Sequence, residues 1–506
     1  MELQSKEGTL GVVLEGDKVV EASEMIRIER ESVQNGGSEE GYMQMVGKKV
    51  AEHVEGFIQN RGLAKRVTLL VGKGNNGGDA LAAGTLLVKR GYQVVGFHVV
   101  DVENSGPLCR KQVEAFLNAG GQIVRGVIPD LKGVLIDGLL GTGFRGGLAP
   151  SFEAIITRAN QSRLPILAID LPSGVNGETG EVDRSAIRAT ETLFLGAAKL
   201  GCLTGKGFGY VGRLVSIDFG LPLHFLQGGR GKGHLIKEEV LPLLLPPIVK
   251  TRHKYEAGYV LALAGSPGMS GAAILACSAA LRAGAGIVRL FHPIEMDGEW
   301  SQAPVELIRT SDSFEDPALF LEEANRAKGC LIGPGLGKGN NLTRFVQTVA
   351  GSLRIPMVLD ADAFFHMKRF PKGALLTPHG GEMGCLLGKK SFSLADCQGF
   401  CETHGVTVLL KGAPTWIFHP KTLPLVSLRG DPGMATAGAG DVLTGIVAAF
   451  LAQGLKGREA AALGAHLHGL CGEISAAEKT SYALIASDLI TALPKSFDRL
   501  LHFSNV

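Results

Sequence analysis

Polar side chains follow three apolar segments in the first half of the chain, and their types suit oxygen-based chemistry. The segments end at Val71, Ile136 and Ile169. The residues that follow them carry amide, carboxylate or hydroxyl oxygens: Asn75, Asn76, Asp79, Asp137, Asp170 and Ser173. Oxygen-only sets suit hard cations, and a carboxylate among them can transfer a proton. Such residues also begin turns and cap helices, so the hypothesis depends on their clustering at three segment ends.

A glycine pattern in the loop after Val71 suggests dinucleotide binding but is weak evidence by itself. Gly72, Gly74 and Gly77 match G-x-G-x-x-G between an apolar segment and a helical one. Glycine makes up 71 of 506 residues. At that frequency the pattern arises by chance roughly once or twice in such a chain. It does recur, at Gly141, Gly143 and Gly146.

In the second half, a run of small residues leads into an apolar helical pattern. The run ends in Gly438-Ala439-Gly440-Asp441, and the helical pattern covers Thr444–Leu455. Backbone N–H groups at such a helix start point at an anion, and the helix dipole adds to the attraction. A carboxylate there can take the proton of a hydroxyl that attacks a phosphoryl group. The alternative is a glycine-rich helix start on which Asp441 is a plain N-terminal charge.

Apolar runs of strand length alternate with helical patterns in both halves, which predicts α/β units with mostly parallel sheets. Strands are expected at 67–71, 94–100, 134–136, 164–169, 259–264, 331–332, 357–359 and 407–410, and helix at 21–60 and in the last ~65 residues. Ligands bind beyond the carboxyl ends of strands in open α/β sheets, so the polar loops are expected to converge.

Glycines and then prolines between Leu221 and Lys254 indicate a domain boundary. We expect domains at 1–222 and 234–506, joined by a linker at 223–233. The uncharged stretch Ala257–Leu281 is long enough to span a bilayer, but Gly265-Ser266-Pro267-Gly268 interrupts it. We therefore expect no membrane span.

Composition argues against a nucleic-acid partner. Lys plus Arg exceed Asp plus Glu by only 51 − 49 = 2, and aromatic residues are 6% of the chain. The first residues lack the apolar segment of a signal peptide, and the eight cysteines show no C-x-x-C spacing. We expect a cytoplasmic enzyme with reduced thiols, small-molecule substrates and a homo-oligomeric state.

The loops of the first half resemble the N-terminal, epimerase domain of NAD(P)H-hydrate repair enzymes. The resemblance covers residues 20–222 and implies a Rossmann-like, doubly wound fold with a potassium ion held by Asn76, Asp137 and Ser173. It places the hydrated nicotinamide substrate along Asn75, Asn76, Gly77, Gly78, Asp79, Gly141, Thr142, Gly143, Phe144, Arg145, Gly146, Gly147 and Asp170. Lys73 and Ala80 depart from the family's usual proline and glycine, but neither change removes an oxygen ligand.

The second half resembles the ADP-dependent NAD(P)H-hydrate dehydratases, which have a ribokinase-like α/β fold. Six motifs recur in order over residues 234–506: Gly265–Ala273, Gly333–Gly337, Asp360–Ala363, Thr377–Glu382, Lys411–Thr415 and Gly438–Asp441. The resemblance places the hydrate near Ala273, Gly335, His379 and Asp441, and the adenosine phosphate on Lys411, Gly412, Ala413, Pro414, Thr415 and Gly440. Tyr255 and Ala437 stand where this family usually has glycine.

Together the resemblances predict a bifunctional enzyme that repairs hydrated NADH and NADPH. The first domain would interconvert the R and S hydrates, with Asp170 transferring a proton. The second would dehydrate the S form at the expense of ADP, with Asp441 as base and Mg²⁺ neutralising charge, giving AMP and phosphate. The main alternative is a ribokinase-like, ATP-dependent kinase whose N-terminal half is a non-catalytic binding module. A plain NAD-dependent dehydrogenase is the least favoured hypothesis, because the sequence shows no second group of catalytic residues for hydride transfer.

Three other groups have a functional and a structural interpretation. Lys199 either meets a substrate phosphate or is structural. His466 and His468, with Cys471 on the same helical segment, could bind a metal, although helix packing is the preferred interpretation. Cys385, Cys397 and Cys401 are the nearest approach to a thiol cluster, and we expect reduced thiols there.

Overall fold

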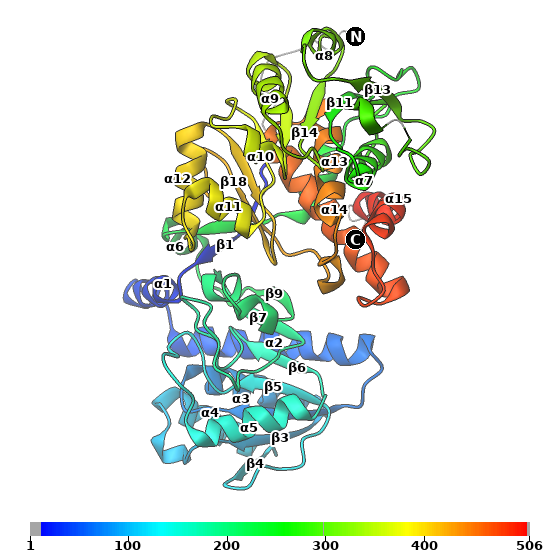
Figure 1. The fold of residues 1–506 in the computed structure, drawn as a ribbon. Coiled ribbons are helices and arrows are strands. Elements are labelled where there is room, and N and C mark those ends of the chain that lie inside the picture. The colour runs from blue at the N-terminus through cyan, green and yellow to red at the C-terminus, as the bar shows by residue number, and fades with distance from the viewer. Residues whose placement is uncertain (1–11, 297, 503–506) are drawn as a thin grey trace, which may run out of the picture. The chain divides into compact units, whose positions relative to one another are not determined.

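The computed structural model describes residues 12–296 and 298–502, which divide into two compact units. One unit is Asp17–Gly233, and the other combines residues 12–16 with the described residues from His234 onward (Figure 1). The division falls at the end of the predicted linker, part of which forms helix α6 (Leu223–Gly228). Among the described helices, none combines the length and the apolar character that crossing a membrane requires.

The sheet of the Asp17–Gly233 unit has parallel strands in the order β4-β3-β2-β5-β6-β7-β9. The strands are β2 (Arg66–Val71), β3 (Gln93–His98), β4 (Gln122–Arg125), β5 (Val134–Gly138), β6 (Ile166–Ile169), β7 (Glu191–Leu195) and β9 (Arg213–Ile217). The chain order changes direction between β2 and β5, and such a switch opens a crevice at the carboxyl ends of the strands. The three polar loops follow β2, β5 and β6, which are neighbours in the sheet.

Helices cover both faces of this sheet, which makes it doubly wound. They are α1 (Ala22–Gln34), α2 (Glu39–Asn60), α3 (Asn75–Lys89), α4 (Pro107–Asn118) and α5 (Pro150–Gln161). Successive strand residues point to opposite faces. Leu69 therefore packs in the core under α1–α4, whereas Leu70 packs with Ile155 and Ile156 of α5.

The expected helical region 21–60 is two helices rather than one. Gly36 has φ +99°, a conformation that favours glycine, and it ends the first helix. The Ser38 hydroxyl accepts a hydrogen bond from Gly41 N and caps α2. A short strand pairing, β1 (Glu15–Val20) with β8 (Ala198–Lys199), positions Lys199 beside the crevice strands.

The sheet of the second unit has the order β13-β12-β11-β14-β15-β16-β17-β18-β19-β10 and is parallel from β13 to β17. Its strands are β10 (Gly233–Ile236), β11 (Tyr259–Leu263), β12 (Ile287–Pro293), β13 (Ile308–Asp312), β14 (Gly329–Ile332), β15 (Met357–Leu359), β16 (Leu375–Leu376), β17 (Thr407–Leu410), β18 (Thr415–Phe418) and β19 (Leu425–Ser427). β18 runs antiparallel to both of its neighbours, a departure from the parallel pattern that the sequence analysis did not specify. A second order switch lies between β11 and β14, where the loops 265–273 and 333–337 meet.

Helices also cover both faces of the second sheet. They are α7 (Ser270–Arg282), α8 (Ala318–Ala324), α9 (Asn340–Ser352), α10 (Ala363–His366), α11 (Gly380–Leu387), α12 (Leu394–His404), α13 (Ala439–Ala452), α14 (Gly457–Lys479) and α15 (Ala486–His502). One core contains α7, α13, α14 and α15 against β11 and β14. On the opposite face, Phe320 of α8 packs on Phe291 of β12 and on Phe345 of α9. Helix α13, buried along most of its length, connects the Asp441 end of the sheet with the other end.

A close approach of α7 to α13 depends on Gly445. A Cβ atom at this position would lie 2.0 Å from the carbonyl oxygen of Ala276, which is backbone and cannot easily move. Because α13 carries Asp441 in its first turn, this contact helps to fix where that carboxylate lies.

We predict that Gly445→Ala destabilises the unit by about 1–3 kcal/mol, because the added methyl group overpacks the α7–α13 contact. The matched control is Gly399→Ala in the exposed part of α12, where no atom lies within 4 Å of the added Cβ. There the loss of backbone freedom in the unfolded chain should stabilise by about 0.5–1 kcal/mol. Urea unfolding midpoints of both variants provide the measurement. Equal shifts in the same direction would contradict the packing argument.

Candidate functional site

Asp137 and Ser173 lie in contact at the carboxyl ends of β5 and β6. Ser173 donates from Oγ to Asp137 Oδ1 at 2.7 Å and from its backbone N to Oδ2 at 2.9 Å. Leu140 N donates to Ser173 Oγ at 2.9 Å, and Asn76 Nδ2 donates to Leu140 O at 2.7 Å. Asp137 is fully buried, and burial raises its pKa to about 6 although the hydrogen bonds from Ser173 oppose the shift.

These residues fit a monovalent cation. The carboxylate of Asp137, the hydroxyl of Ser173, the amide oxygen of Asn76 and the carbonyl of Leu140 are all oxygen donors. Asp137 supplies the only full negative charge of this set. A cation beside it would offset the burial that holds the pKa of its carboxyl above the usual range.

A cavity of about 400 Å³ opens beside this cluster. Of the residues predicted to contact the nicotinamide substrate, seven line it: Asn75, Asn76, Asp79, Gly141, Thr142, Gly143 and Asp170. The cavity also has walls from α1 and α2, including Glu29, Tyr42 and Met43, and from Phe219 after β9. From the sequence, residues 21–60 were predicted only to be helical, with no part in a site. An acidic residue beside the apolar positions of α1 was the available signal for Glu29.

The other predicted substrate residues of this unit do not line the cavity. Gly77 and Gly78 lie in the first turn of α3, and a Cβ there would meet Gly72 O at 2.2 Å or the Met43 side chain at 2.6 Å. Packing therefore accounts for both glycines. Phe144, Gly146 and Gly147 follow in the same loop. Arg145 is exposed and donates from Nη1 to Thr142 O and Phe144 O.

Four carboxyl groups line this cavity, from Glu29, Glu39, Asp79 and Asp170. Burial raises the pKa of Glu29 to about 7, and the neighbouring Asp170 adds to the shift. Burial, with the charges of Glu29 and Asp170, also raises the pKa of Asp79 well above its usual range. Asp170 has φ +68° and forms a buried ion pair with Lys199. Lys199 thus has a structural partner, and its Nζ also donates to Leu195 O at 2.9 Å.

In the second unit, Lys411 and Asp360 form the central contact of the candidate nucleotide site. Lys411 Nζ lies 2.7 Å from Asp360 Oδ1, and Thr444 Oγ1 of α13 donates to Asp360 Oδ2 at 2.6 Å. Asp360 is almost fully buried. The contact joins the ends of β15 and β17 to the first turns of α13, so it brings the Lys411–Thr415 loop beside Gly440. A Cβ on Gly440 would lie 3.2 Å from Lys411 Nζ.

Asp441 lies half-buried in the first turn of α13, next to this ion pair. Burial raises its pKa to about 7, and the negative charge of Asp360 adds to the shift while Lys411 opposes it. Gly438, with φ +90°, caps the helix, and the N–H groups that follow point out of its start. A carboxylate with this pKa beside an anion-binding helix start is suited to general-base work near neutral pH.

His379 lies on a neighbouring strand end but is 60% exposed at its side chain. Its Nδ1 accepts from Gly381 N and Glu382 N, so the ring caps α11. His379 pairs with Lys411 in a parallel bridge. The predicted His379, Lys411, Gly440 and Asp441 are therefore grouped at one edge of the sheet. Asp362 and Glu382 add negative charge there. Both belong to motifs of the second half, but the sequence assigned neither residue a role.

Ala273 and Gly335 lie on the other side of this edge, at the β11–β14 switch. Ala273 is buried in α7, and Gly335 has φ +58°. Ser266 Oγ donates to Gly335 O at 2.9 Å, which ties the two loops together. Gly412, Ala413 and Pro414 complete the turn between β17 and β18 that ends at Thr415.

The histidines of α14 are packed rather than grouped for a metal. His468 Nε2 lies 2.9 Å from Ala439 O, and burial lowers the pKa of His468 to about 4. Burial lowers the pKa of His466 to about 3. Among the described residues, no three His, Cys, Asp or Glu side chains are grouped to hold a metal ion. Cys397 and Cys401 are buried free thiols, and Cys385 is an exposed one.

Comparison with known proteins identifies the family of each half of the chain. Residues 260–495 match the family model of NAD(P)H-hydrate dehydratase, and residues 39–201 match that of the YjeF-related protein N-terminus. The bifunctional NAD(P)H-hydrate repair enzyme Nnr of Moorella thermoacetica is 34% identical over 483 residues, covering 89% of this chain and 91% of that protein. The Escherichia coli protein of the same name is 34% identical over 446 residues, covering 85% of each chain.

A solved structure also aligns with the second unit. It is the ADP/ATP-dependent NAD(P)H-hydrate dehydratase of Bacillus subtilis, co-crystallised with ATP and Mg²⁺. The alignment has a TM-score of 0.47 and 26% identity, over 53% of this chain and 99% of that chain.

The fold is that of a two-unit α/β protein, with a Rossmann-like unit followed by a ribokinase-like one, each carrying carboxylates at the carboxyl ends of its parallel strands. The chain belongs to the family of bifunctional NAD(P)H-hydrate repair enzymes.

We predict that Lys199→Met destabilises the first unit by about 3–5 kcal/mol, because it leaves the buried Asp170 carboxylate without its cation. Adding Asp170→Asn to this variant should recover part of the loss, since the uncompensated charge is then gone. The exposed Lys206→Met is the matched control and should shift the unfolding midpoint little. Denaturant unfolding of the four proteins tests the interaction. A double variant less stable than Lys199→Met would contradict it.

Proposed function

We propose that the first unit interconverts the R and S hydrates of NADH and NADPH, and that the second dehydrates the S form at the expense of ADP. The observation that carries the proposal is that matches to bifunctional repair enzymes extend over most of the chain while each unit has a carboxylate site at the carboxyl ends of its parallel strands. We expect a cytoplasmic homo-oligomer, as the sequence suggested. Mixing the protein with ADP and NADH hydrate, and following the return of reduced-nicotinamide absorbance, tests the function directly.

For dehydration, the added ring hydroxyl is a poor leaving group until phosphate is attached to it. The Asp441 carboxylate accepts the hydroxyl proton while the oxygen attacks the β-phosphorus of ADP, and the bond to AMP breaks. N–H groups of Gly438–Asp441 face the transferring phosphoryl group, and Lys411 adds positive charge. The bond between the ring carbon and the phosphorylated oxygen then breaks, and phosphate leaves. The neighbouring ring carbon loses a proton, and the dihydronicotinamide is restored.

Magnesium, which neutralises phosphate charge when bound, fits this site as a companion of the nucleotide. The nearby carboxylates already have protein partners: Asp360 has Lys411 and Thr444, Asp362 accepts from Gly337 N, and Glu382 accepts from His379 N. Mg²⁺ is commonly held by one or two carboxylates together with substrate phosphates. Asp362 and Glu382 are the protein groups close enough to contribute, since both charges act on Asp441.

For epimerisation, Asp170 is the proposed proton-transfer residue of the cavity. It lines the cavity and forms a buried ion pair with Lys199, so its carboxylate is held where a substrate proton could be exchanged. Glu29, with a pKa of about 7, is a second group that can give or take a proton in the same cavity. A potassium ion held by Asn76, Asp137 and Ser173 would lie beside the loop that carries Gly141 and Thr142.

The kinase alternative has less support. A kinase for a stable alcohol would use ATP and would leave a phosphorylated product. The first unit as a non-catalytic module would have no need of four carboxyl groups in one cavity. The repair enzyme would release AMP and regenerate NADH, whereas the kinase would release ADP and a stable phosphate ester. Identifying the products therefore separates the two hypotheses.

We predict that Asp441→Asn lowers the dehydration rate by at least ~10²-fold, because amide nitrogen cannot act as the base. In the unchanged enzyme, kcat/KM should fall as the pH drops below about 7, since the Asp441 carboxyl becomes protonated there. Steady-state rates on the S hydrate at saturating ADP and magnesium measure both effects. ADP titration is the control and should be nearly unchanged. A variant with near-normal turnover would place the base elsewhere.

We predict that Asp137→Ala abolishes epimerisation and leaves dehydration of the pure S hydrate nearly unchanged. Asp137 supplies the only full charge for the proposed potassium ion, and it lies in a different unit from Asp441. The two activities are measured separately, by R-to-S conversion and by absorbance with ADP. Added K⁺ should also raise the unfolding temperature of the unchanged protein but not that of the variant. A parallel loss of both activities in a folded variant would contradict separate sites.

A further inference from the structure

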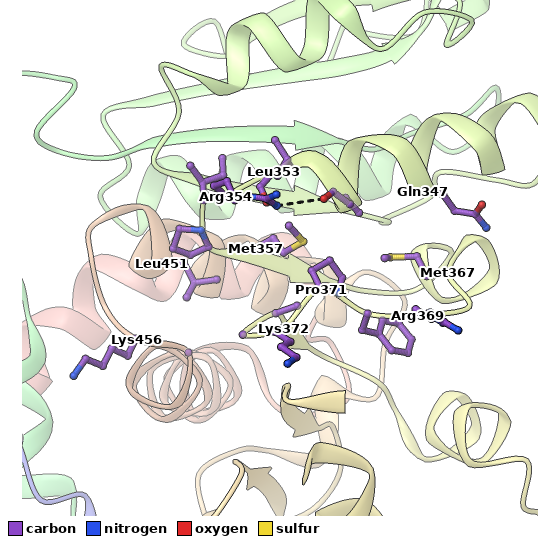
Figure 2. A pocket seen from close by; sticks show the side chains of 18 of the residues that line it. Gln347, Leu353, Arg354, Met357, Met367, Arg369, Pro371, Lys372, Leu451 and Lys456 are labelled. Atoms are coloured by element: carbon purple, nitrogen blue, oxygen red, sulfur yellow. Dashed lines mark hydrogen bonds between the residues drawn. The ribbon is translucent and has the colours of Figure 1, made fainter. Parts of the chain in front are cut away.

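A hollow of about 880 Å³ lies in the second unit, at the amino ends of β15 and β16 (Figure 2). It is bordered by the end of α9, the loop between α10 and β16, and the turn between α13 and α14. The candidate dehydratase site lies at the opposite, carboxyl ends of these strands. About ten residues of α13 separate Asp441 from Leu451 at the hollow, a rise of about 15 Å.

Five cationic side chains line the hollow: Arg354, Lys368, Arg369, Lys372 and Lys456. No described carboxylate lines it, and none of the five forms an ion pair with the described part of the chain. The whole chain has a formal charge of only +2. This hollow is therefore a local concentration of positive charge, whereas the cavity of the first unit is lined by carboxyl groups.

Helix capping explains little of this charge. Arg354 Nη1 donates to Gly351 O at 3.3 Å and Leu353 O at 3.4 Å, at the end of α9 (Figure 2). That is the stabilising end for a cation. Lys456 directly precedes α14, where the helix dipole disfavours a cation. Lys368, Arg369 and Lys372 lie in the loop after α10, and all three are exposed.

The floor of the hollow is apolar. Leu353, Met357, Leu451 and Leu455 line it and are each at most 8% exposed. Phe370 and Pro371 complete the apolar side between the cationic residues. An apolar surface bordered by fixed cations suits a ligand with a ring system and several phosphate charges, and the volume is in the range of small-molecule sites.

We propose that this hollow is a second nucleotide site, which binds a nucleotide with two or more phosphates: the ring lies on the Leu353–Met357 floor and the phosphates contact Lys368, Arg369 and Lys372. It is separate from the nucleotide site at Lys411 and does not depend on the proposed catalytic function. The strands that begin here, β15 and β16, end at Asp360 and at Thr377–His379 of the candidate catalytic edge. A ligand here would thus contact the far ends of the elements that carry that edge.

Photolabelling with 2-azido-ADP, followed by peptide mapping, tests the proposal on the full chain. The charge-reversal variant is Lys368→Glu with Lys372→Glu, and Arg369→Gln is a milder second variant. The exposed Lys390→Glu is the matched control. We expect labelled peptides from residues 347–374 in the unchanged protein and the control, and at least tenfold less label there in the charge-reversal variant. Label near Lys411 and dehydration at saturating ADP should stay the same.

Calorimetric titration with ADP supplies the second readout. We expect two binding sites per chain in the unchanged protein and one in the charge-reversal variant, with weaker binding at the hollow as salt increases. One site in the unchanged protein, or label confined to the Lys411 region, would overturn the proposal. So would binding of a single-stranded oligonucleotide in place of ADP. A change of oligomeric state on charge reversal, without ADP bound at the hollow, would instead make this face a contact between copies of the chain.

Discussion

The buried contact between Lys411 and Asp360 is the interaction on which the second unit's candidate site depends. Asp360 follows β15, Lys411 follows β17 and Thr444 lies on α13, so one carboxylate joins three elements that are distant in the sequence. Burying such a pair is costly unless its hydrogen bonds are complete, and here both carboxylate oxygens are engaged. The residual negative charge of Asp360, added to burial, holds the pKa of Asp441 near neutrality. The first unit has an analogous pair, Lys199 with Asp170.

Most of the fold follows from periodicity and from the position of glycine and proline. The expected strands at 67–71, 357–359 and 407–410 correspond closely to β2, β15 and β17, because each is a short aliphatic run between turn residues. Periodicity could not separate α1 from α2, since the apolar pattern continues across a break made by Gly36. Nor did it reveal the antiparallel β18, whose direction is set by the tight turn after Lys411 and by pairing with β17 and β19.

The candidate sites were predictable where a residue follows a strand, because parallel strands bring their carboxyl ends together. Asp137, Asp170 and Lys411 have this local signal, and Asp441 has a different one, the run of small residues that leads into its helix. Glu29, Tyr42 and Phe219 do not, since helices α1 and α2 and the segment after β9 reach the first cavity through tertiary packing alone. Four of the five cations of the basic hollow lie within residues 354–372, but only the fold brings them together with Lys456 and with the apolar residues Leu451 and Leu455.

The contacts around Gly77 and Gly78 indicate which residues an inactive copy of this unit would keep. Gly77 is required by the protein's own backbone, because a Cβ there would lie 2.2 Å from Gly72 O, whereas a Cβ on Gly78 would meet only the flexible end of the Met43 side chain. A duplicated gene that had lost its chemistry would still need Gly77 in order to fold. Gly77 would therefore survive, and so would Asp170, whose buried ion pair with Lys199 stabilises the unit, whereas Glu29 on the cavity wall would be free to change. The carboxyl group of Glu29, and not the more conspicuous glycines, is what distinguishes a working unit from an inactive one.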